Sequence, residues 1–264
     1  PLFLSQIAEI QDTYQHDVTA SLESWRSLLA GARDHRVHLA GLAEVQARLG
    51  IARQLEVLHQ TDQAIEQLTA VIALDPKAPF SSLALAHLRL GEAYDRLGER
   101  ERALAAYRAA VAALPAGDPF KVRTQTAARI RRAPDARRAE AYRLSIEGWR
   151  RLEKHDPAGA VATLERSLTI NTADPVARYR YGRALQAARN DAAALAQFEA
   201  TIRAARDCPP PILGTAYLDA ARLHERAGHR DRALSYYRIA STLFGAAGDT
   251  RATASRAVTR LESK

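Results

Sequence analysis

The residues with the most obvious chemical potential are His224, Glu225 and His229, the types that bind zinc and supply the general base of a metalloprotease. That chemistry needs the second histidine at position i+4, so that both imidazoles share one face of a helix. Here it stands at i+5, and Gly228, a residue typical of a turn, lies between the two. We therefore expect no zinc site here.

Other reactive side chains are equally isolated. His35 and His38 follow Asp34 at a spacing that suits one helical face, but the sequence offers them no third metal ligand. Cys208 is the single cysteine, so neither an intrachain disulfide nor a thiolate cluster can form, and no histidine is assigned to activate it. Glycines occur singly, without a phosphate-binding loop. The sequence predicts no enzyme, no cofactor and no metal site.

A fixed spacing of small and large residues is the strongest pattern in the chain. Residues 84–117 carry Leu90, Gly91, Tyr94, Gly98, Ala103, Tyr107, Ala110 and Pro115. Small residues allow two helices to cross closely and large ones fill the space beside the crossing, while Gly98 suits the turn between them. The alanine-to-large spacing recurs in phase, which predicts units at 45–78, 84–117, 141–174, 175–208 and 214–247.

The unit at 84–117 resembles a tetratricopeptide repeat, although Tyr107 replaces the usual Phe and His87 stands where Trp is common. The resemblance implies an all-α fold, a right-handed superhelix or α-solenoid of helix-turn-helix pairs. It also implies a concave groove, lined by the first helix of each pair, that binds peptides or protein segments without catalysis. No Lys/Asn clamp for a chaperone tail is visible.

The repeat phase predicts a domain organisation. We expect N-terminal helices over 1–44, which form a degenerate repeat or a cap, and a first repeat block over 45–117. A basic helical connector over 118–140, a second block over 141–247 and a capping helix over 248–264 follow. Pro209, Pro210 and Pro211 should be non-helical and should stiffen a joint between units.

The resemblance also indicates which residues face the groove. In unit 84–117 these are Leu85, Leu88, Glu92 and Asp95. In the second block the partner-binding residues are expected to be Tyr142, Trp149, Tyr179, Arg183, Tyr217 and Arg222. Aromatic residues and arginine are enriched at binding hot spots. The alternative is that these aromatics simply pack one repeat against the next.

The positive charge is concentrated in one segment. The net charge of the chain is +8, and residues 121–143 hold eight basic residues against Asp135 and Glu140. The basic patch consists of Lys121, Arg123, Arg129, Arg131, Arg132, Arg137 and Arg138, with Arg143 beyond it. Three interpretations remain open: a solvated connecting helix, a dock for an acidic protein or anionic surface, and a nucleic-acid site. Pro134 should divide any helix here into two short pieces.

The function expected from these observations is a protein-interaction scaffold. The alternatives are a structural module of a bacterial envelope or secretion complex and a binder of polyanions or nucleic acid through residues 121–143.

Methionine is absent and the N-terminus looks incomplete, so a signal or anchor could precede Pro1. No run is long enough to span a membrane. Location therefore stays open between cytoplasm and periplasm or envelope, as does oligomeric state. Ala- and Arg-rich, Lys-poor usage suggests a bacterial source.

Overall fold

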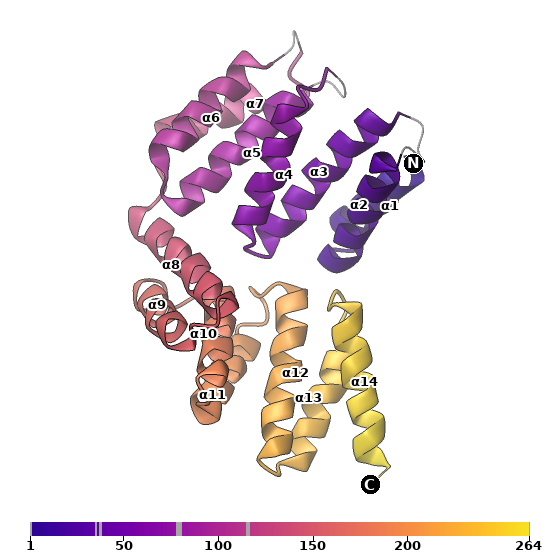
Figure 1. Cartoon of the computed structure of the whole chain (residues 1–264), viewed down its shortest axis with the longest axis vertical. Helices are drawn as coiled ribbons and strands as arrows, with labels where there is room; N and C mark the ends of the chain where they lie inside the picture. Colours follow the sequence, from indigo (N-terminus) through magenta and orange to yellow (C-terminus); the bar gives the residue numbers. More distant parts are fainter. Residues whose placement is uncertain (1, 35, 37–38, 78–80, 115–116, 264) are drawn as a thin grey trace. The chain divides into compact units, whose positions relative to one another are not determined.

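A computed structural model describes residues 2–34, 36, 39–77, 81–114 and 117–263. All regular structure in these residues is helical, with fourteen α-helices and no strand (Figure 1). His35, His38 and Pro115 lie outside the described residues. The chain divides into two compact units, Pro1–Gln15 with Ala20–Glu140 and His16–Thr19 with Ala141–Lys264.

The helices of the first half are α1 Leu2–Thr13, α2 Val18–Arg33, α3 Ala40–Val57, α4 Thr61–Ala73, α5 Ser82–Leu97, α6 Arg100–Ala112 and α7 Val122–Arg131. The remaining helices are α8 Ala136–Glu153, α9 Pro157–Ile170, α10 Pro175–Ala187, α11 Asp191–Arg203, α12 Pro210–Arg226, α13 Arg230–Thr242 and α14 Gly248–Glu262. The boundary between the two units falls inside α8.

In both units consecutive helices form hairpins that stack on the next hairpin. In the first unit α3 packs on α4 and α5 on α6, and α4 also packs on α5. In the second unit α10 packs on α11 and α12 on α13, and α11 contacts α12. The fold is therefore the predicted all-α solenoid of helix pairs, because each amphipathic helix buries its apolar side against its neighbours in the series.

The repeat glycines have the packing role that their spacing predicts. A Cβ at Gly91 would overlap with the ring of Tyr107, and one at Gly182 would meet Phe198 Cε1 at 2.6 Å. Ala103, at the same crossing as Gly91, is fully buried. Gly98 ends α5 with φ of 78°, a left-handed conformation that glycine adopts without strain. The small residues thus allow each pair of helices to approach closely.

The proline run behaves differently from the prediction. Pro210 and Pro211 are not a non-helical joint but the first turn of α12, and only Pro209 precedes the helix. The first turn of a helix tolerates proline because its N–H groups have no intrahelical acceptor and the ring fixes a suitable φ. The unit expected at 214 therefore begins with a longer first helix.

The basic segment also departs from the expected pair of short helices. Its first part is α7, of 10 residues, but its second part is the start of α8, which has 18 residues. Helix α7 contacts α6 and α5, just as α5 contacts α4 and α3. Val122 and Thr126 are buried there. Helix α7 thus takes the place that the first helix of a further unit would have.

The last helix, α14, covers the end of the second unit. It packs on α13 and also contacts α12, and Ala254, Ala257 and Leu261 are buried in this cluster. The apolar residues recur at helical spacing on one side of α14, which leaves its other side polar. An array of stacked hairpins needs such a helix over its terminal apolar face.

Candidate functional site

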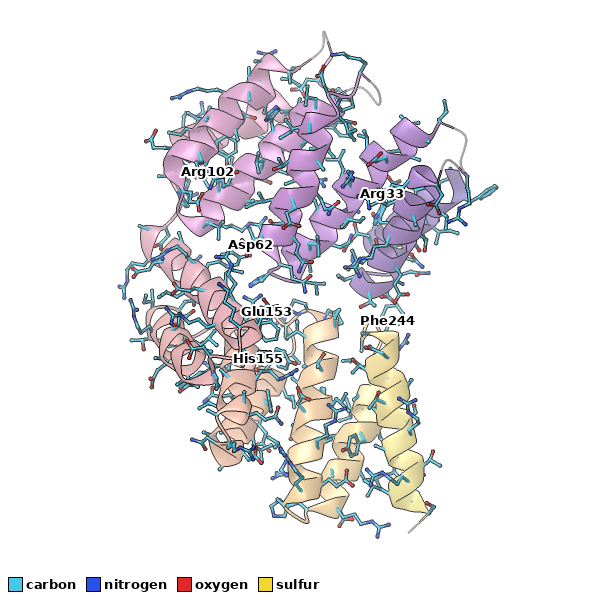
Figure 2. All side chains as sticks on the ribbon, viewed as in Figure 1. Arg33, Asp62, Arg102, Glu153, His155 and Phe244 are labelled. Carbon is cyan, nitrogen blue, oxygen red and sulfur yellow. The ribbon has the colours of Figure 1, made fainter. Side chains whose placement is uncertain are left out.

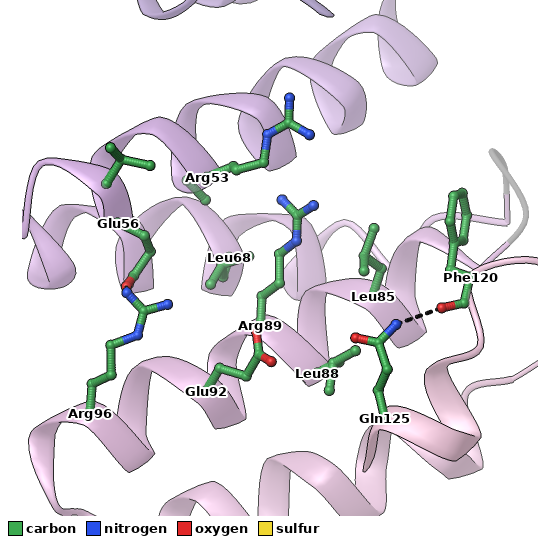
Figure 3. A pocket seen from close by; sticks show the side chains of 12 residues that line it. Arg53, Glu56, Leu68, Leu85, Leu88, Arg89, Glu92, Arg96, Phe120 and Gln125 are labelled. Atoms are coloured by element: carbon green, nitrogen blue, oxygen red, sulfur yellow. Dashed lines mark hydrogen bonds and ion pairs between the residues drawn. The ribbon is translucent and has the colours of Figure 1, made fainter. Parts of the chain in front are cut away.

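The first unit contains a cavity of about 580 Å³ that is lined mainly by α3, α5 and the segment at the start of α7, with Leu68 contributed by α4 (Figure 3). Its lining residues are Ala52, Arg53, Glu56, Val57, Leu68, Leu85, Leu88, Arg89, Glu92, Arg96, Phe120 and Gln125. Helices α3 and α5 are the first helices of their pairs. The cavity therefore lies on the face that the resemblance assigns to ligand binding.

The two ends of this cavity differ in character. Figure 3 shows Arg96 and Glu56 at one end, Leu85 and Phe120 toward the other, and Arg89 between them. Gln125 of α7 donates from Nε2 to the carbonyl oxygen of Phe120 at 2.7 Å, which holds this segment at the start of α7. The connector therefore supplies a wall of the cavity.

Most charges around the cavity are paired. Arg96 contacts the Glu56 carboxylate, and Arg53 contacts Asp12 of α1. Arg129 of α7 forms an ion pair with Glu92 at 2.9 Å. These pairs join α3 to α5, α1 to α3 and α5 to α7.

Arg89 is different. It is partly buried, and its Nη1 donates to the carbonyl oxygen of Leu49 at 3.0 Å. In the described part of the chain, no carboxylate lies within ion-pairing distance of its guanidinium. Burial, and then the neighbouring charge of Arg53, lower the pKa of Arg89 to about 10. Glu92 and Glu56 act in the opposite direction and favour the charged form of Arg89. Among the described residues their direct ion pairs are with Arg129 and Arg96, so Arg89 is a partly buried cation without a carboxylate in direct contact.

Burial also shifts the pKa values of two side chains next to Arg89. It raises the pKa of Glu56 above its usual range, although Arg96 favours the charged form, and Glu92 adds to the increase. Burial lowers the pKa of Arg53, while Glu9 acts in the opposite direction. The cavity is thus a site where charged groups are partly removed from water.

Of the four groove positions expected in unit 84–117, Leu85, Leu88 and Glu92 line the cavity. Asp95 does not. It is 7% exposed, and its carboxylate accepts hydrogen bonds from Arg100 at 2.9 Å and from the Tyr107 hydroxyl at 2.8 Å. Asp95 therefore joins the two helices of one hairpin instead of facing a ligand.

In the second unit, three of the expected groove residues meet at a carboxylate, Asp219, that is not among the predicted groove residues. Asp219 on α12 is 3% exposed and accepts from the Tyr179 hydroxyl at 3.2 Å and from Arg222 at 3.2 Å. Arg183 on α10 lies 3.5 Å from the same carboxylate and donates to the Tyr179 hydroxyl at 3.0 Å. Burial raises the pKa of Asp219, against the effect of both arginines.

The other expected groove residues lie apart from that network. The Arg180 guanidinium lies 5.7 Å from the centre of the Trp149 ring and donates to the Ser145 hydroxyl at 2.9 Å. Tyr217 packs edge-on against Tyr236, with ring centres 5.5 Å apart. Trp149, Tyr217 and Tyr142 are all partly buried.

Arg89, Arg180 and Asp219 share a sequence feature that could have revealed them. Each is the sixth residue of its predicted unit, a position where a charged side chain faces the neighbouring first helix. Arg180 is 5% exposed, and Asp219 is also buried. A charged residue at a buried repeat position needs a partner, because an unpaired buried charge is costly. A charged residue at the sixth position of a unit therefore indicates a buried polar contact with the neighbouring first helix.

The basic patch is exposed along its whole length. Lys121, Arg123, Arg129, Arg131, Arg132, Arg137 and Arg138 are all exposed. Only Arg129 forms an ion pair among the contacts of the described residues, and it binds Glu92 of the cavity. The carbonyl oxygens of Arg129 and Ile130 accept from Arg100, which attaches the end of α7 to α6.

The residues with catalytic side chains are engaged in packing. Nδ1 of His224 lies 3.4 Å from Nδ1 of His229 across the turn at Gly228, and Nε2 of His224 lies 3.2 Å from Glu199. Glu225 instead accepts from Arg260 and Tyr237. Cys208 is buried, and burial raises the pKa of its thiol to about 12. Among the described residues, no group of three or more His, Cys, Asp or Glu is arranged to hold a metal.

None of the described helices has the length and apolar character needed to cross a membrane.

Among curated protein sequences, no relative matches the chain. Solved structures with a similar fold include MamA, which is 21% identical over 72% of this chain and 92% of its own, with a TM-score of 0.35. The TPR2AB domain of yeast Sti1 in complex with pHSP90 is 16% identical, and the match covers 100% of this chain and 98% of that domain, with a TM-score of 0.40. YrrB, a TPR protein with an unusual peptide-binding site, is 16% identical, and the match covers 89% of this chain and 99% of YrrB, with a TM-score of 0.38.

Two family models match the sequence itself, and both describe tetratricopeptide repeats. One matches residues 84–115, which contain the hairpin α5–α6. The other matches residues 151–213, from the end of α8 to the start of α12. Both matches coincide with stacked helix pairs whose crossing glycines, Gly91 and Gly182, have the packing role expected from the repeat spacing. The chain therefore contains tetratricopeptide repeats in these two segments.

Proposed function

We propose that this protein is a non-catalytic interaction scaffold that binds a segment of a partner protein in the cavity between α3, α5 and α7. The observation that carries the proposal is the cavity itself, because about 580 Å³ is large enough for several side chains of a peptide. It combines leucines, an exposed phenylalanine and charged groups, the mixture that gives a binding site both apolar contact and orientation.

The wall formed by α7 supports this site. Phe120 is 50% exposed although it lines the cavity, so its ring is available to a ligand. Arg129 ties α7 to Glu92, and Val122, two turns earlier in the same helix, is fully buried. The walls of the cavity are therefore helices held by packing and ion pairs, and such preorganisation lowers the entropy cost of binding.

Photocrosslinking tests this proposal. Phe120 is replaced by p-benzoylphenylalanine, which keeps an aromatic ring in place, and the protein is irradiated in an extract of the cells that produce it. Phe244, which is 61% exposed between α13 and α14, is the matched control (Figure 2). We expect one partner segment to crosslink at Phe120 and not at Phe244. Equal crosslinking of the same proteins at both positions contradicts the proposal.

A second candidate function is the binding of an anionic polymer by the basic patch. The supporting observation is that its six members other than Arg129 are exposed and form no ion pair among the described residues. Binding that depends on such residues weakens steeply as salt rises, because released counterions drive it. Replacement of Arg131, Arg132 and Arg137 by alanine should then abolish binding of a mixed RNA or DNA pool. Unchanged binding by the triple variant removes this candidate.

A further inference from the structure

The cavity of the first unit contains one cation, Arg89, that has no ion pair with the described residues, although Glu92 and Glu56 are near enough to favour its charged form. Arg53, Arg96 and Arg129 each contact a carboxylate, whereas the guanidinium of Arg89 donates to the Leu49 carbonyl oxygen and has no carboxylate partner in the part of the chain that the structure describes. Figure 3 shows Arg53 and Arg89 next to each other, projecting from α3 and α5. Two adjacent guanidinium groups repel each other, and a carboxylate between or beside them would relieve that repulsion.

We propose that Arg89, with Arg53 beside it, binds the carboxylate of an acidic side chain in the partner segment. This inference rests on the proposed function of the cavity and names the chemical class of its ligand, an acidic peptide. The guanidinium of Arg89 still has N–H groups beyond the one that binds Leu49. A planar guanidinium and a carboxylate form two parallel hydrogen bonds. This arrangement fixes the orientation of the carboxylate and also makes the contact stronger.

The position of Arg89 favours a side chain over the end of a peptide chain. Arg89 lies between the Glu56–Arg96 end of the cavity and the apolar end at Leu85 and Phe120 (Figure 3). A segment that fills the cavity therefore continues on both sides of Arg89, and its acidic group there belongs to a side chain. An apolar residue of the same segment would contact Leu85 and Phe120.

The carboxylates of the cavity argue for a single negative charge. Glu56 and Glu92 line the same space as Arg89. A phosphate group carries about two negative charges near neutral pH and would be repelled by both glutamates. A carboxylate carries one charge and matches the guanidinium of Arg89, which has no ion pair with the described residues. Charge complementarity therefore selects Asp or Glu over a phosphorylated residue.

Arg89 is poorly explained as a stabilising residue. Its neighbour Arg53 and its partly buried position both disfavour its charged form, as the lowered pKa shows. Replacing a poorly paired buried charge by an apolar side chain of similar size is often neutral or stabilising. We expect Arg89→Met to unfold at the same or a higher urea concentration than the parent protein. Loss of binding in a variant with intact stability then reports on recognition.

Two matched peptide mixtures test the inference. Both contain fluorescein-labelled hexapeptides with Ala, Leu, Phe or Ser at five positions, an N-terminal block and a C-terminal amide. The third position is Glu in one mixture and Gln in the other. We expect the Glu mixture to bind the full chain about tenfold more tightly in fluorescence anisotropy, the effect of a charge-assisted hydrogen bond. The preference should disappear in Arg89→Met.

The control variant is Arg108→Met. Arg108 is an exposed residue of α6 that does not line the cavity, so its replacement removes the same charge elsewhere in the same unit. It should keep the preference for Glu. Equal binding of the two mixtures, or a preference that survives in Arg89→Met, overturns the inference. So does binding that requires a free C-terminal carboxylate, measured with the Gln mixture lacking the amide.

Failure of this inference is distinguishable from failure of the proposed function. If Phe120 crosslinks a partner segment but the Glu preference is absent, the cavity binds a ligand of another chemistry. If Phe120 crosslinks nothing beyond the Phe244 control, the cavity itself is not the interaction site.

Discussion

Tyr179 on α10 donates a hydrogen bond from its hydroxyl to the buried carboxylate of Asp219 on α12, across 3.2 Å and 40 residues of sequence. The two residues belong to successive repeats, so this bond joins the first helix of one hairpin to that of the next. Arg183 and Arg222 approach the same carboxylate from the two helices. Tyr179, at 4% exposure, therefore connects repeats and is not an open aromatic anchor.

The Tyr179–Asp219 bond should contribute measurably to stability. We expect Tyr179→Phe to lower the free energy of unfolding by about 1 kcal/mol, the typical net value of an intramolecular hydrogen bond. Asp219→Ala should cost more than Asp219→Asn, because alanine leaves the buried hydroxyl and both arginines without an acceptor. Urea denaturation followed by circular dichroism measures all three. Equal losses for the alanine and asparagine variants would contradict this account.

The crossing at Gly91 should tolerate no side chain. We expect Gly91→Ala to destabilise the protein by about 1–3 kcal/mol, because the added methyl group overlaps with the ring of Tyr107. Gly41→Ala is the control, since a Cβ at Gly41 in α3 has no atom within 4 Å. Alanine there should be neutral or stabilising, owing to its higher helix propensity. Thermal melts of the parent protein and both variants measure these differences in stability.

The raised pKa of Glu56 predicts a pH-dependent difference between the parent protein and Glu56→Gln. A carboxyl group whose folded pKa exceeds its unfolded value binds a proton more tightly when folded. The free energy of unfolding of the parent should therefore rise relative to the variant as pH falls through the folded pKa. The difference should level off below the unfolded pKa. A difference that stays constant from neutral pH to pH about 4 would refute the shift.

The buried thiol of Cys208 should react slowly. Its pKa of about 12 leaves almost no thiolate at neutral pH, and the thiolate is the nucleophile. We expect a disulfide reagent to modify Cys208 far more slowly in the folded protein than in urea, where the thiol returns to its ordinary pKa. The absorbance of the released chromophore gives both rates. Similar rates in the two conditions would show that the thiol is accessible.

Much of the fold follows from local spacing alone. The small-to-large pattern at Gly91, Ala103 and Tyr107 predicts a close helix crossing, and the structure confirms it because such a crossing depends only on residues within one hairpin. Gly98 is equally local, since a left-handed residue at the end of α5 needs no distant contact. The start of α12 at Pro210 was mispredicted, because proline is excluded from a helix interior but accepted in its first turn.

The charged sites were decided by tertiary structure. Helical periodicity places Glu92, Leu85 and Leu88 on one face, but it does not show that α7 closes that face into a cavity or that Arg129 binds Glu92. Nor does it show that Tyr179 bonds to Asp219, or that Arg89 has no ion pair among the described residues. Repeat spacing fixes which side of a helix a residue occupies, whereas an ionic partner depends on how neighbouring hairpins pack. The energy of an ion pair depends on the distance between the two charges in space, and that distance is set by the packing of hairpins that are separated in the sequence.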